Sequence, residues 1–387
     1  MYFREEIGES LTLKFAESAR KRKSRGLPIV SLGLGEPDFD TPAELINATI
    51  AELQKGNSTY STPLGVLPLR EQIAHRLELE NKIPATPGNI LVAAGAKQAF
   101  QIVLMALLEP RDHVIVVEPA FVSFIPQLYL AEPDCEVSTV NVDSEDFSLP
   151  VDRIEQLITA KTKAIIINTP NNPAGYVIGE QELKKLYQIA EKNDCYIISD
   201  EVYEKLVFEG QYHFSVGSLE REVSRVITIN GYSKSHAMTG WRLGYACYPA
   251  ELNSKILKIQ QHMNTNTCTF VQAAVAGVGN KMDMTYLKVY CRELKSRSEI
   301  VAEAVESTSC LGLVKPVSGF FSFINISETG MTSNDYCSEL IERVGVATTP
   351  GIAFGESWDD HIRLSFATDA QILNEGLAKL VEFSEGL

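Results

Sequence analysis

Three polar residues follow apolar runs in a way that would bring them together in a parallel sheet. Lys234, Asp200 and Asn172 each stand at, or a few residues beyond, the end of a short apolar run. An amine can act as a nucleophile or a general base, and an aspartate at the end of a buried strand is costly unless it is paired. If the three runs are parallel strands, their carboxyl ends share the edge at which open α/β sheets bind ligands.

The runs themselves predict the elements that position these residues. They read VITI at 226–229, CYIIS at 195–199 and AIIIN at 164–168. Short, continuous apolar runs are typical of strands that are buried on both faces of a parallel sheet. Asn230 and Gly231 form a turn signal, so Lys234 is expected in a loop just beyond its strand.

The segment GYSKSHAMTGWRLG at 231–244 resembles the lysine signature of the class I aminotransferases. These are pyridoxal-phosphate enzymes of the aspartate aminotransferase type, and similar landmarks recur from about Ser10 to Thr368. The resemblance implies an α/β protein of fold type I. Its large domain has a mostly parallel seven-stranded sheet sandwiched by helices, and a smaller α+β domain is attached. Residues 44–280 are assigned to the large domain, and residues 1–43 with 281–387 to the small one.

The resemblance also implies how the cofactor, pyridoxal 5′-phosphate, is held. Lys234 is the residue to which it is covalently attached, and later the general base of a 1,3-proton shift. Asp200 pairs with the protonated pyridine nitrogen, an attraction of about 4 kcal/mol for unit charges ~4 Å apart at an effective dielectric near 20. Asn172 and Tyr203 hydrogen-bond the phenolic oxygen, and Phe121 stacks on the ring, although most relatives carry Trp or Tyr there.

The cofactor phosphate is expected at the start of a helix. The segment ILVAAGAKQ at 90–98 reads as a strand, a glycine turn and the first turn of a helix over 96–108. Free N–H groups and a partial positive charge at a helix N-terminus favour a phosphate. The resemblance assigns the phosphate to Gly95, Ala96, Lys97, Ser233, Arg242 and, from the other subunit of a homodimer, Tyr60.

Substrate contacts are implied at four positions. Gly35 lies in the segment VSLGLGEPDFDTP at 30–42, where a residue without a side chain lets the backbone approach the substrate carboxylate closely. Arg363 matches the arginine that grips the α-carboxylate with its planar guanidinium group, and Asn172 is also assigned to the substrate. Lys97 stands where an aspartate- and prephenate-using subgroup carries a lysine for the distal carboxylate.

The sequence is therefore identified as an aminotransferase that moves an amino group between an L-amino acid and a 2-oxoacid. Lys97 favours aspartate or glutamate with 2-oxoglutarate. Aromatic amino acids or prephenate are the alternative, although Gly33 stands where some prephenate-using relatives carry a hydroxyl residue. Phe121 and Ala174, which depart from the family pattern, could signal a specialised biosynthetic enzyme. A lyase, decarboxylase or oxidase on the same fold is the next alternative, while a regulatory protein would have no need of the full residue set.

Composition limits the remaining classes. The 387 residues are 45% hydrophobic and 22% charged, as in an ordinary soluble globular protein of up to two domains. A net charge of −15 argues against nucleic-acid or anionic-membrane binding. Seven singly spaced cysteines are expected as reduced thiols of a cytoplasmic protein. No metal-binding histidine spacing, secretory signal or membrane span is evident.

Helices are also expected outside the motifs. A helix over 12–25 carries a basic cluster that includes Arg20 and should face solvent. A second helix covers 43–55, with Thr41 as its N-cap and Pro42 at its first position. A long helix over 282–307 should link the chain to the small domain.

Overall fold

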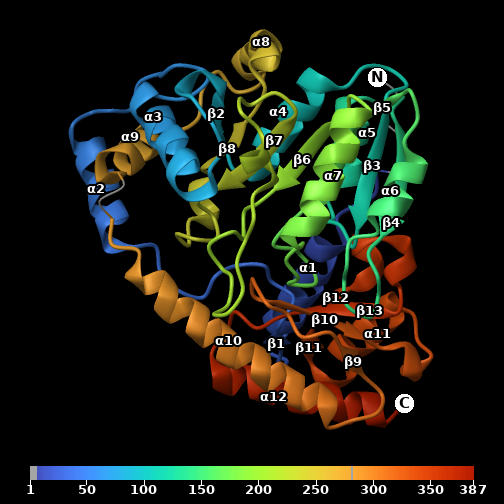
Figure 1. Cartoon of the computed structure of the whole chain (residues 1–387). Helices are drawn as coiled ribbons and strands as arrows, with labels where there is room; N and C mark the ends of the chain where they lie inside the picture. The colour runs from blue at the N-terminus through green and yellow to red at the C-terminus, as the bar shows by residue number, and fades with distance from the viewer. Residues whose placement is uncertain (1–6, 280–281) are drawn as a thin grey trace.

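The computed structural model describes residues 7–279 and 282–387. Its main feature is a seven-stranded sheet with the strand order β2-β8-β7-β6-β5-β3-β4, seen in the upper half of Figure 1. The strands are β2 (Ile90–Ala93), β3 (His113–Glu118), β4 (Glu136–Asn141), β5 (Thr162–Asn168), β6 (Tyr196–Asp200), β7 (Val226–Gly231) and β8 (Gly244–Cys247). Only β8 runs against its neighbours, β2 and β7, so the predicted mostly parallel sheet and fold class are confirmed.

Helices cover both faces of this sheet. In β5, Ile165 and Ile167 enter one apolar cluster, while Ala164 and Ile166 enter the cluster on the opposite face. The first cluster also receives residues from α6 (Val151–Leu157) and α7 (Glu180–Lys192). The second receives them from α4 (Ala96–Leu107), α5 (Phe124–Ala131) and α8 (Asn253–Met263). Burial on both faces explains why these strands read as continuous apolar runs.

A further helical layer lies at the β2 and β8 end of the sheet. It contains α2 (Ala43–Gln54), α3 (Leu67–Arg76) and α9 (Thr269–Val278), which lie together in Figure 1. The predicted N-cap of α2 is wrong, because Pro42 occupies that position and no side chain caps the helix. Thr41 instead donates a hydrogen bond from Oγ1 to the carbonyl of Ala237 over 2.7 Å, which ties this segment to the lysine loop.

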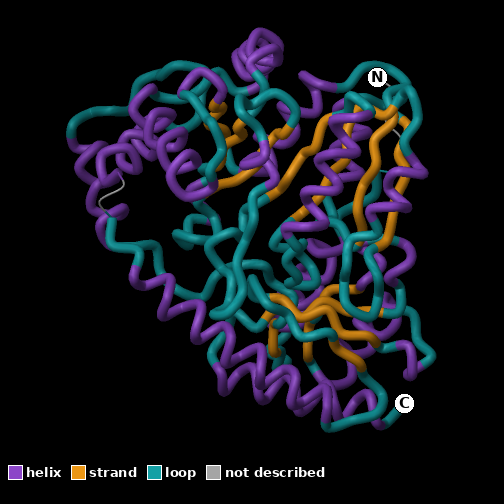
Figure 2. The backbone as a smooth tube through the Cα atoms, viewed as in Figure 1, coloured by secondary structure: helices purple, strands orange, loops and turns teal. Residues whose placement is uncertain are grey.

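A second group of strands lies below the large sheet, and Figure 2 shows loops filling the region between the two groups. An antiparallel sheet has the order β12-β13-β10-β9, and β1 pairs in parallel with β11. The bounds are β1 (Val30–Ser31), β9 (Gly312–Leu313), β10 (Phe321–Asn325), β11 (Val346–Ala347), β12 (Thr349–Pro350) and β13 (His361–Ser365). One apolar cluster joins these strands, apart from β12, to α1 (Leu11–Ser24), α10 (Thr285–Glu306), α11 (Ser333–Glu339) and α12 (Ala370–Glu385).

The helix α10 crosses from the α9 side of the molecule to α12 along the lower edge in Figure 1. The large sheet lies within residues 44–280, and the antiparallel sheet lies within 281–387. The predicted boundary at residues 280 and 281 lies outside the described residues, so the domain division stays a prediction. Among the described helices, none combines the length and apolarity needed to cross a membrane.

Candidate active site

The carboxyl ends of β5, β6 and β7 meet at one edge, because these strands are parallel neighbours. Asp200 ends β6, Asn172 follows Asn168 at the end of β5, and Lys234 follows Gly231 at the end of β7. A cavity of about 650 Å³ lies here. The sequence-predicted residues that line it are Gly35, Ala96, Lys97, Phe121, Asn172, Asp200, Tyr203, Ser233, Lys234, Arg242 and Arg363.

Lys234 is held in the cavity by a backbone group far away in the sequence. Its Nζ donates a hydrogen bond to the carbonyl oxygen of Gly35 over 2.6 Å, and it lies 5.7 Å from the centre of the Tyr203 ring. Burial, with the positive charge of Arg363 nearby, lowers the pKa of Lys234 to about 8. The amine is therefore much easier to deprotonate than a solvated lysine, as a general base requires.

Asp200 is a nearly buried carboxylate, 8% exposed, at the floor of the cavity. Its Oδ1 accepts a hydrogen bond from the backbone N–H of Val202 over 3.2 Å. Burial raises the pKa of Asp200 to about 7, and the neighbouring Glu201 adds to the rise. A cationic partner in the cavity would stabilise its ionised form. Burial also raises the pKa of Tyr203, so that its phenol keeps the proton it needs to donate a hydrogen bond.

Arg363, on β13, meets the turn after β5. Its Nη1 donates a hydrogen bond to Oδ1 of Asn172 over 2.9 Å, and its Nη2 donates one to the carbonyl of Gly33 over 2.8 Å. Its Nε is buried and has no hydrogen-bond partner among the described residues. Burial lowers the pKa of Arg363 to about 10, so the group remains a cation that can accept an anionic ligand.

The N-terminus of α4 and the guanidinium group of Arg242 lie close together and form a potential anion-binding site. The N–H groups of the first helical turn, at Ala96 and Lys97, have no carbonyl partner within the helix. Gly95 precedes them at φ 91°, and a Cβ there would come within 2.4 Å of Nη2 of Arg242. A Cβ on Gly244 would come within 2.2 Å of the Ala96 nitrogen. Both glycines are therefore required for the helix start, the guanidinium group and β8 to pack this closely.

These groups fit pyridoxal phosphate, the cofactor that the sequence resemblance implies. The helix N-terminus and Arg242 match a phosphate, Asp200 matches a protonated pyridine nitrogen, and Asn172 and Tyr203 can serve its phenolic oxygen. Lys234 offers an amine with a lowered pKa in the same cavity. The individual roles stay predictions.

Lys97 and Phe121 form one wall of the cavity. The Nζ of Lys97 lies 5.2 Å from the centre of the Phe121 ring, within the range of a cation–π contact. Phe121 in turn meets Phe124 edge to face, with ring centres 5.6 Å apart. Burial, with Arg242 nearby, lowers the pKa of Lys97. A carboxylate placed beside Lys97 would stabilise its charged form.

Two predicted phosphate residues do not line this cavity. Gly95 lies directly behind Arg242, as described above. Tyr60 is 85% exposed and lines a different hollow of about 550 Å³, beside Phe270. Tyr60 therefore lies outside the cavity of its own chain, and its role in the partner subunit stays a prediction.

The helix α1 supplies residues that the sequence prediction missed. Thr12, Ala16 and Arg20 recur at every fourth position and line the cavity together with Leu13. Phe15, on another side of the helix, packs into the core. Arg20 is exposed, as expected for the basic cluster, and it also lies on the cavity wall. Arg20 follows Thr12 and Ala16 at intervals of four residues, and this spacing indicates that the three side chains share one face of the helix.

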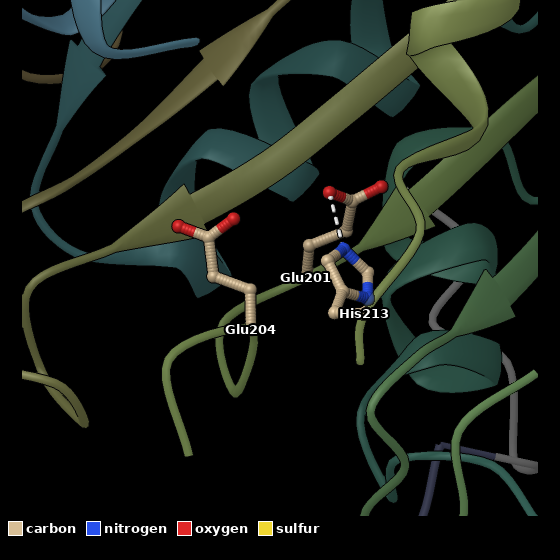
Figure 3. A group of neighbouring side chains, drawn as sticks. All are labelled: Glu201, Glu204 and His213. Atoms are coloured by element: carbon tan, nitrogen blue, oxygen red, sulfur yellow. Dashed lines mark hydrogen bonds and ion pairs between the residues drawn. The ribbon is translucent and has the colours of Figure 1, made fainter. Parts of the chain in front are cut away.

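Behind the cavity, the segment that carries Asp200 and Tyr203 bears two buried carboxylates that sequence reasoning also missed. The ligand atoms of Glu201, Glu204 and His213 lie within 4.8 Å of one another (Figure 3). Carboxylates and an imidazole at such distances can bind a metal ion. The sequence has no paired-histidine spacing at these residues, so the group becomes apparent only in the folded chain.

Hydrogen bonds from protein groups already engage Glu201. Both Ser199 and Ser215 donate to its Oε1, over 2.8 and 2.9 Å, and Nε2 of His213 lies 3.0 Å from its Oε2. Burial works against protonation of His213, but Glu201 outweighs it and the pKa of His213 is raised. This carboxylate thus anchors the backbone next to Asp200.

Cations already face Glu204. It accepts a hydrogen bond from Asn81 over 2.5 Å, and Arg76 and Lys205 lie 3.7 and 4.0 Å from its Oε1. Arg76 also hydrogen-bonds the hydroxyl of Tyr245. Two positive charges beside Glu204 oppose the entry of a metal ion, so we interpret the group as a structural network behind the cavity.

Comparisons with known proteins agree with this geometry. Residues 28–380 match the family model described as aminotransferase class I and II. An aspartate aminotransferase from Pyrococcus abyssi is 36% identical over 354 residues, 91% of this chain and 90% of that protein. An aromatic-amino-acid aminotransferase from Thermococcus litoralis has the same identity and coverage. A solved aspartate aminotransferase from Thermus thermophilus, with maleate, has a TM-score of 0.92 at 31% identity and covers 100% of both chains.

Proposed function

This chain belongs to the class I and II aminotransferases, and from that membership we propose that it moves an amino group between aspartate and glutamate, with 2-oxoglutarate as the oxoacid that accepts the amino group of aspartate. The observation that carries the choice of substrate is a pair of cationic side chains in one cavity, the exposed Lys97 and the buried Arg363. A dicarboxylic amino acid offers one carboxylate to each of them. The chain as a whole is acidic, with a net charge of −15. The cavity is lined instead by more cationic than acidic residues, namely Arg20, Lys97, Lys234, Arg242 and Arg363 against Glu36 and Asp200, which favours anionic substrates.

The contacts of Arg363 support its role at the α-carboxylate. Its Nη1 and Nη2 are held by Asn172 and Gly33, which fixes the plane of the guanidinium group. Its buried Nε lacks a partner among the described residues, and leaving such a donor unsatisfied is costly. A substrate carboxylate would remove that cost, because planar guanidinium and carboxylate groups form paired, charge-assisted hydrogen bonds.

The residues of this chain then have separate tasks in the reaction. Pyridoxal phosphate, when bound, supplies an electron sink for the electron pair left at the substrate Cα. The pKa of Lys234 is lowered to about 8, so its Nζ can accept the proton from the substrate Cα. The same Nζ then donates that proton in the second half of the 1,3-proton shift. Asp200 would keep the pyridine nitrogen protonated, and Arg363 would orient the substrate so that the Cα proton faces Lys234.

We also propose that two copies of this chain share their sites. Tyr60 is 85% exposed and lies outside its own chain's cavity. On α2, in the same outer layer, Ile46, Ile50 and Leu53 are exposed at 39, 48 and 48%, at the spacing of one helix face. An interface over this layer would cover the apolar residues and would bring Tyr60 to the partner's cofactor phosphate.

Aromatic amino acids are the second candidate substrates. The cavity has an apolar wall formed by Leu34, Phe100, Phe121 and Phe124, which could pack against an aromatic side chain. The aromatic aminotransferase among the relatives, as similar in sequence as the aspartate enzyme, supports keeping this alternative.

A half-reaction with one substrate at a time tests these proposals. The cofactor-loaded protein is mixed with single L-amino acids, and the cofactor absorbance is followed. A spectral change with aspartate or glutamate that 2-oxoglutarate reverses is the expected result. Reaction with aromatic amino acids alone would overturn the choice of dicarboxylates while leaving transamination intact. Release of ammonia without that reversible change would indicate a lyase or oxidase instead.

A further inference from the structure

The loop formed by residues 33–41 holds Lys234 and Arg363 through its backbone. The carbonyl of Gly35 accepts a hydrogen bond from Nζ of Lys234 over 2.6 Å, and that of Gly33 accepts one from Nη2 of Arg363 over 2.8 Å. A Cβ on Gly35 would lie only 3.2 Å from the Phe321 ring, so the loop packs closely on β10. A shift of this loop would therefore move the acceptors that orient Lys234 and Arg363.

Asp38, in the same loop, is fastened to the long helix α10. Its Oδ1 accepts a hydrogen bond from the hydroxyl of Tyr290 over 2.9 Å, and its Oδ2 accepts one from Nη1 of Arg297 over 2.6 Å. The side chain of Arg297 is 9% exposed and that of Asp38 is 25% exposed, so water screens this ion pair only partly. Phe39 adds a ring contact, with its centre 4.2 Å from that of Tyr290.

The lysine loop is connected to the same two elements. The hydroxyl of Thr41 donates to the carbonyl of Ala237 over 2.7 Å, and the hydroxyl of Tyr286, on α10, donates to the carbonyl of Ser235 over 2.8 Å. The 33–41 loop, α10 and the lysine loop thus each bind the other two. Without such bonds, a loop with no regular hydrogen-bonding pattern would sample many conformations.

We propose that Asp38, together with Tyr290 and Arg297, is the positioning unit for substrate carboxylate recognition. These side chains do not line the active-site cavity, and they act by holding the loop whose carbonyls orient Arg363 and Lys234. The inference rests on the proposed function in one respect, since it takes Arg363 as the group that binds the substrate carboxylate. It assigns to α10 a role in substrate affinity in addition to packing.

Two mild substitutions and a matched control test the proposal. Tyr290→Phe removes one hydroxyl and keeps the ring that packs on Phe39, and Asp38→Asn removes the charge that faces Arg297. The control, Glu293→Gln, removes the other ion pair of Arg297, in which Glu293 is 56% exposed. For the first two variants the KM of amino acid and oxoacid should rise at least about fivefold with kcat within about twofold, as expected for a lost charge-assisted contact that supports binding.

A second measurement separates this inference from the proposed function. Succinate, a dicarboxylate that cannot transaminate, is titrated into each cofactor-loaded protein, and its dissociation constant is read from the cofactor absorbance. Weaker succinate binding in Tyr290→Phe and Asp38→Asn, with cofactor affinity and the control unchanged, is expected. Unchanged succinate affinity in both folded variants would overturn the proposal, as would an equal loss of cofactor affinity. Failure of the unmodified protein to transaminate would instead count against the proposed function.

Discussion

Arg363 donates a hydrogen bond to Asn172 over 2.9 Å, although 191 residues separate them in the sequence. Arg363 lies on β13 of the antiparallel sheet, and Asn172 lies in the turn after β5 of the large sheet. The bond therefore crosses between the two groups of strands at the cavity. It sets the proposed carboxylate-binding group at a defined distance from the residues predicted to hold the cofactor, so the two parts of the site are assembled together.

Arg363→Lys should strongly impair use of every amino acid substrate. Lysine keeps a positive charge but lacks the planar guanidinium group. That group can hydrogen-bond Asn172, Gly33 and the substrate carboxylate at the same time. We expect kcat/KM to fall about 100-fold or more, which corresponds to about 2.7 kcal/mol, while the cofactor absorbance is preserved. Steady-state kinetics with Arg343→Lys, an exposed arginine, provides the control. An unchanged kcat/KM for Arg363→Lys would remove this residue from substrate binding.

Lys97→Met should change substrate preference rather than abolish transfer. Methionine keeps an unbranched apolar side chain but loses the charged Nζ that lies 5.2 Å from the centre of the Phe121 ring, so it cannot bind a distal carboxylate. We expect kcat/KM for aspartate and glutamate to fall about 10- to 100-fold, the usual scale for losing one charge-assisted contact, while that for phenylalanine stays within about threefold. The ratio of the two values is the measurement. Equal losses for both substrates would contradict a distal-carboxylate role.

Asp200→Asn should stabilise the cofactor-free protein near pH 8. Burial raises the pKa of Asp200 from 3.8 to about 7, so the folded state binds more protons than the unfolded state between these values. The cost of ionising Asp200 therefore grows as the pH rises from about 4 to about 7 and is fully present above that range. Asparagine avoids this cost, and we expect a gain of up to about 4 kcal/mol at pH 8.

Thermal unfolding of cofactor-free wild-type and Asp200→Asn protein at pH 5 and pH 8 measures that gain. The difference between the two proteins should be clearly larger at pH 8. A wild-type protein that is the more stable of the two at pH 8 would show that a cation within the chain already balances this carboxylate.

Tyr60→Ala and Lys234→Ala subunits should restore activity when they are mixed. Lys234→Ala lacks the proposed base, and Tyr60→Ala lacks the residue proposed to reach the partner's phosphate. In a dimer with shared sites, a mixed dimer has one complete site, so random mixing should recover about a quarter of the wild-type activity. The activity is assayed after subunit exchange at low concentration. Recovery no greater than the sum of the separate variants would place Tyr60 outside the partner's site.

Local patterns were enough to predict much of the sheet edge. The runs before Asn172, Asp200 and Lys234 proved to be β5, β6 and β7, adjacent and parallel, because short apolar runs that alternate with turns specify strands largely by themselves. Helix ends were also close, with α10 at Thr285–Glu306 against a predicted 282–307. The N-cap at Thr41 was wrong because its hydroxyl found a partner at Ala237 instead, which no local rule describes.

The sequence by itself determined the family, the strands that end at the cavity and the chemical types of the side chains that follow them. Tertiary structure alone decided which distant groups these side chains meet: Lys234 with Gly35, Arg363 with Asn172 and Asp38 with α10. Strand and turn formation depend on neighbours within a few residues, so the sequence encodes them locally. Contacts across hundreds of residues depend on how whole layers pack, and that is settled only when the apolar surfaces of the two strand groups are buried together.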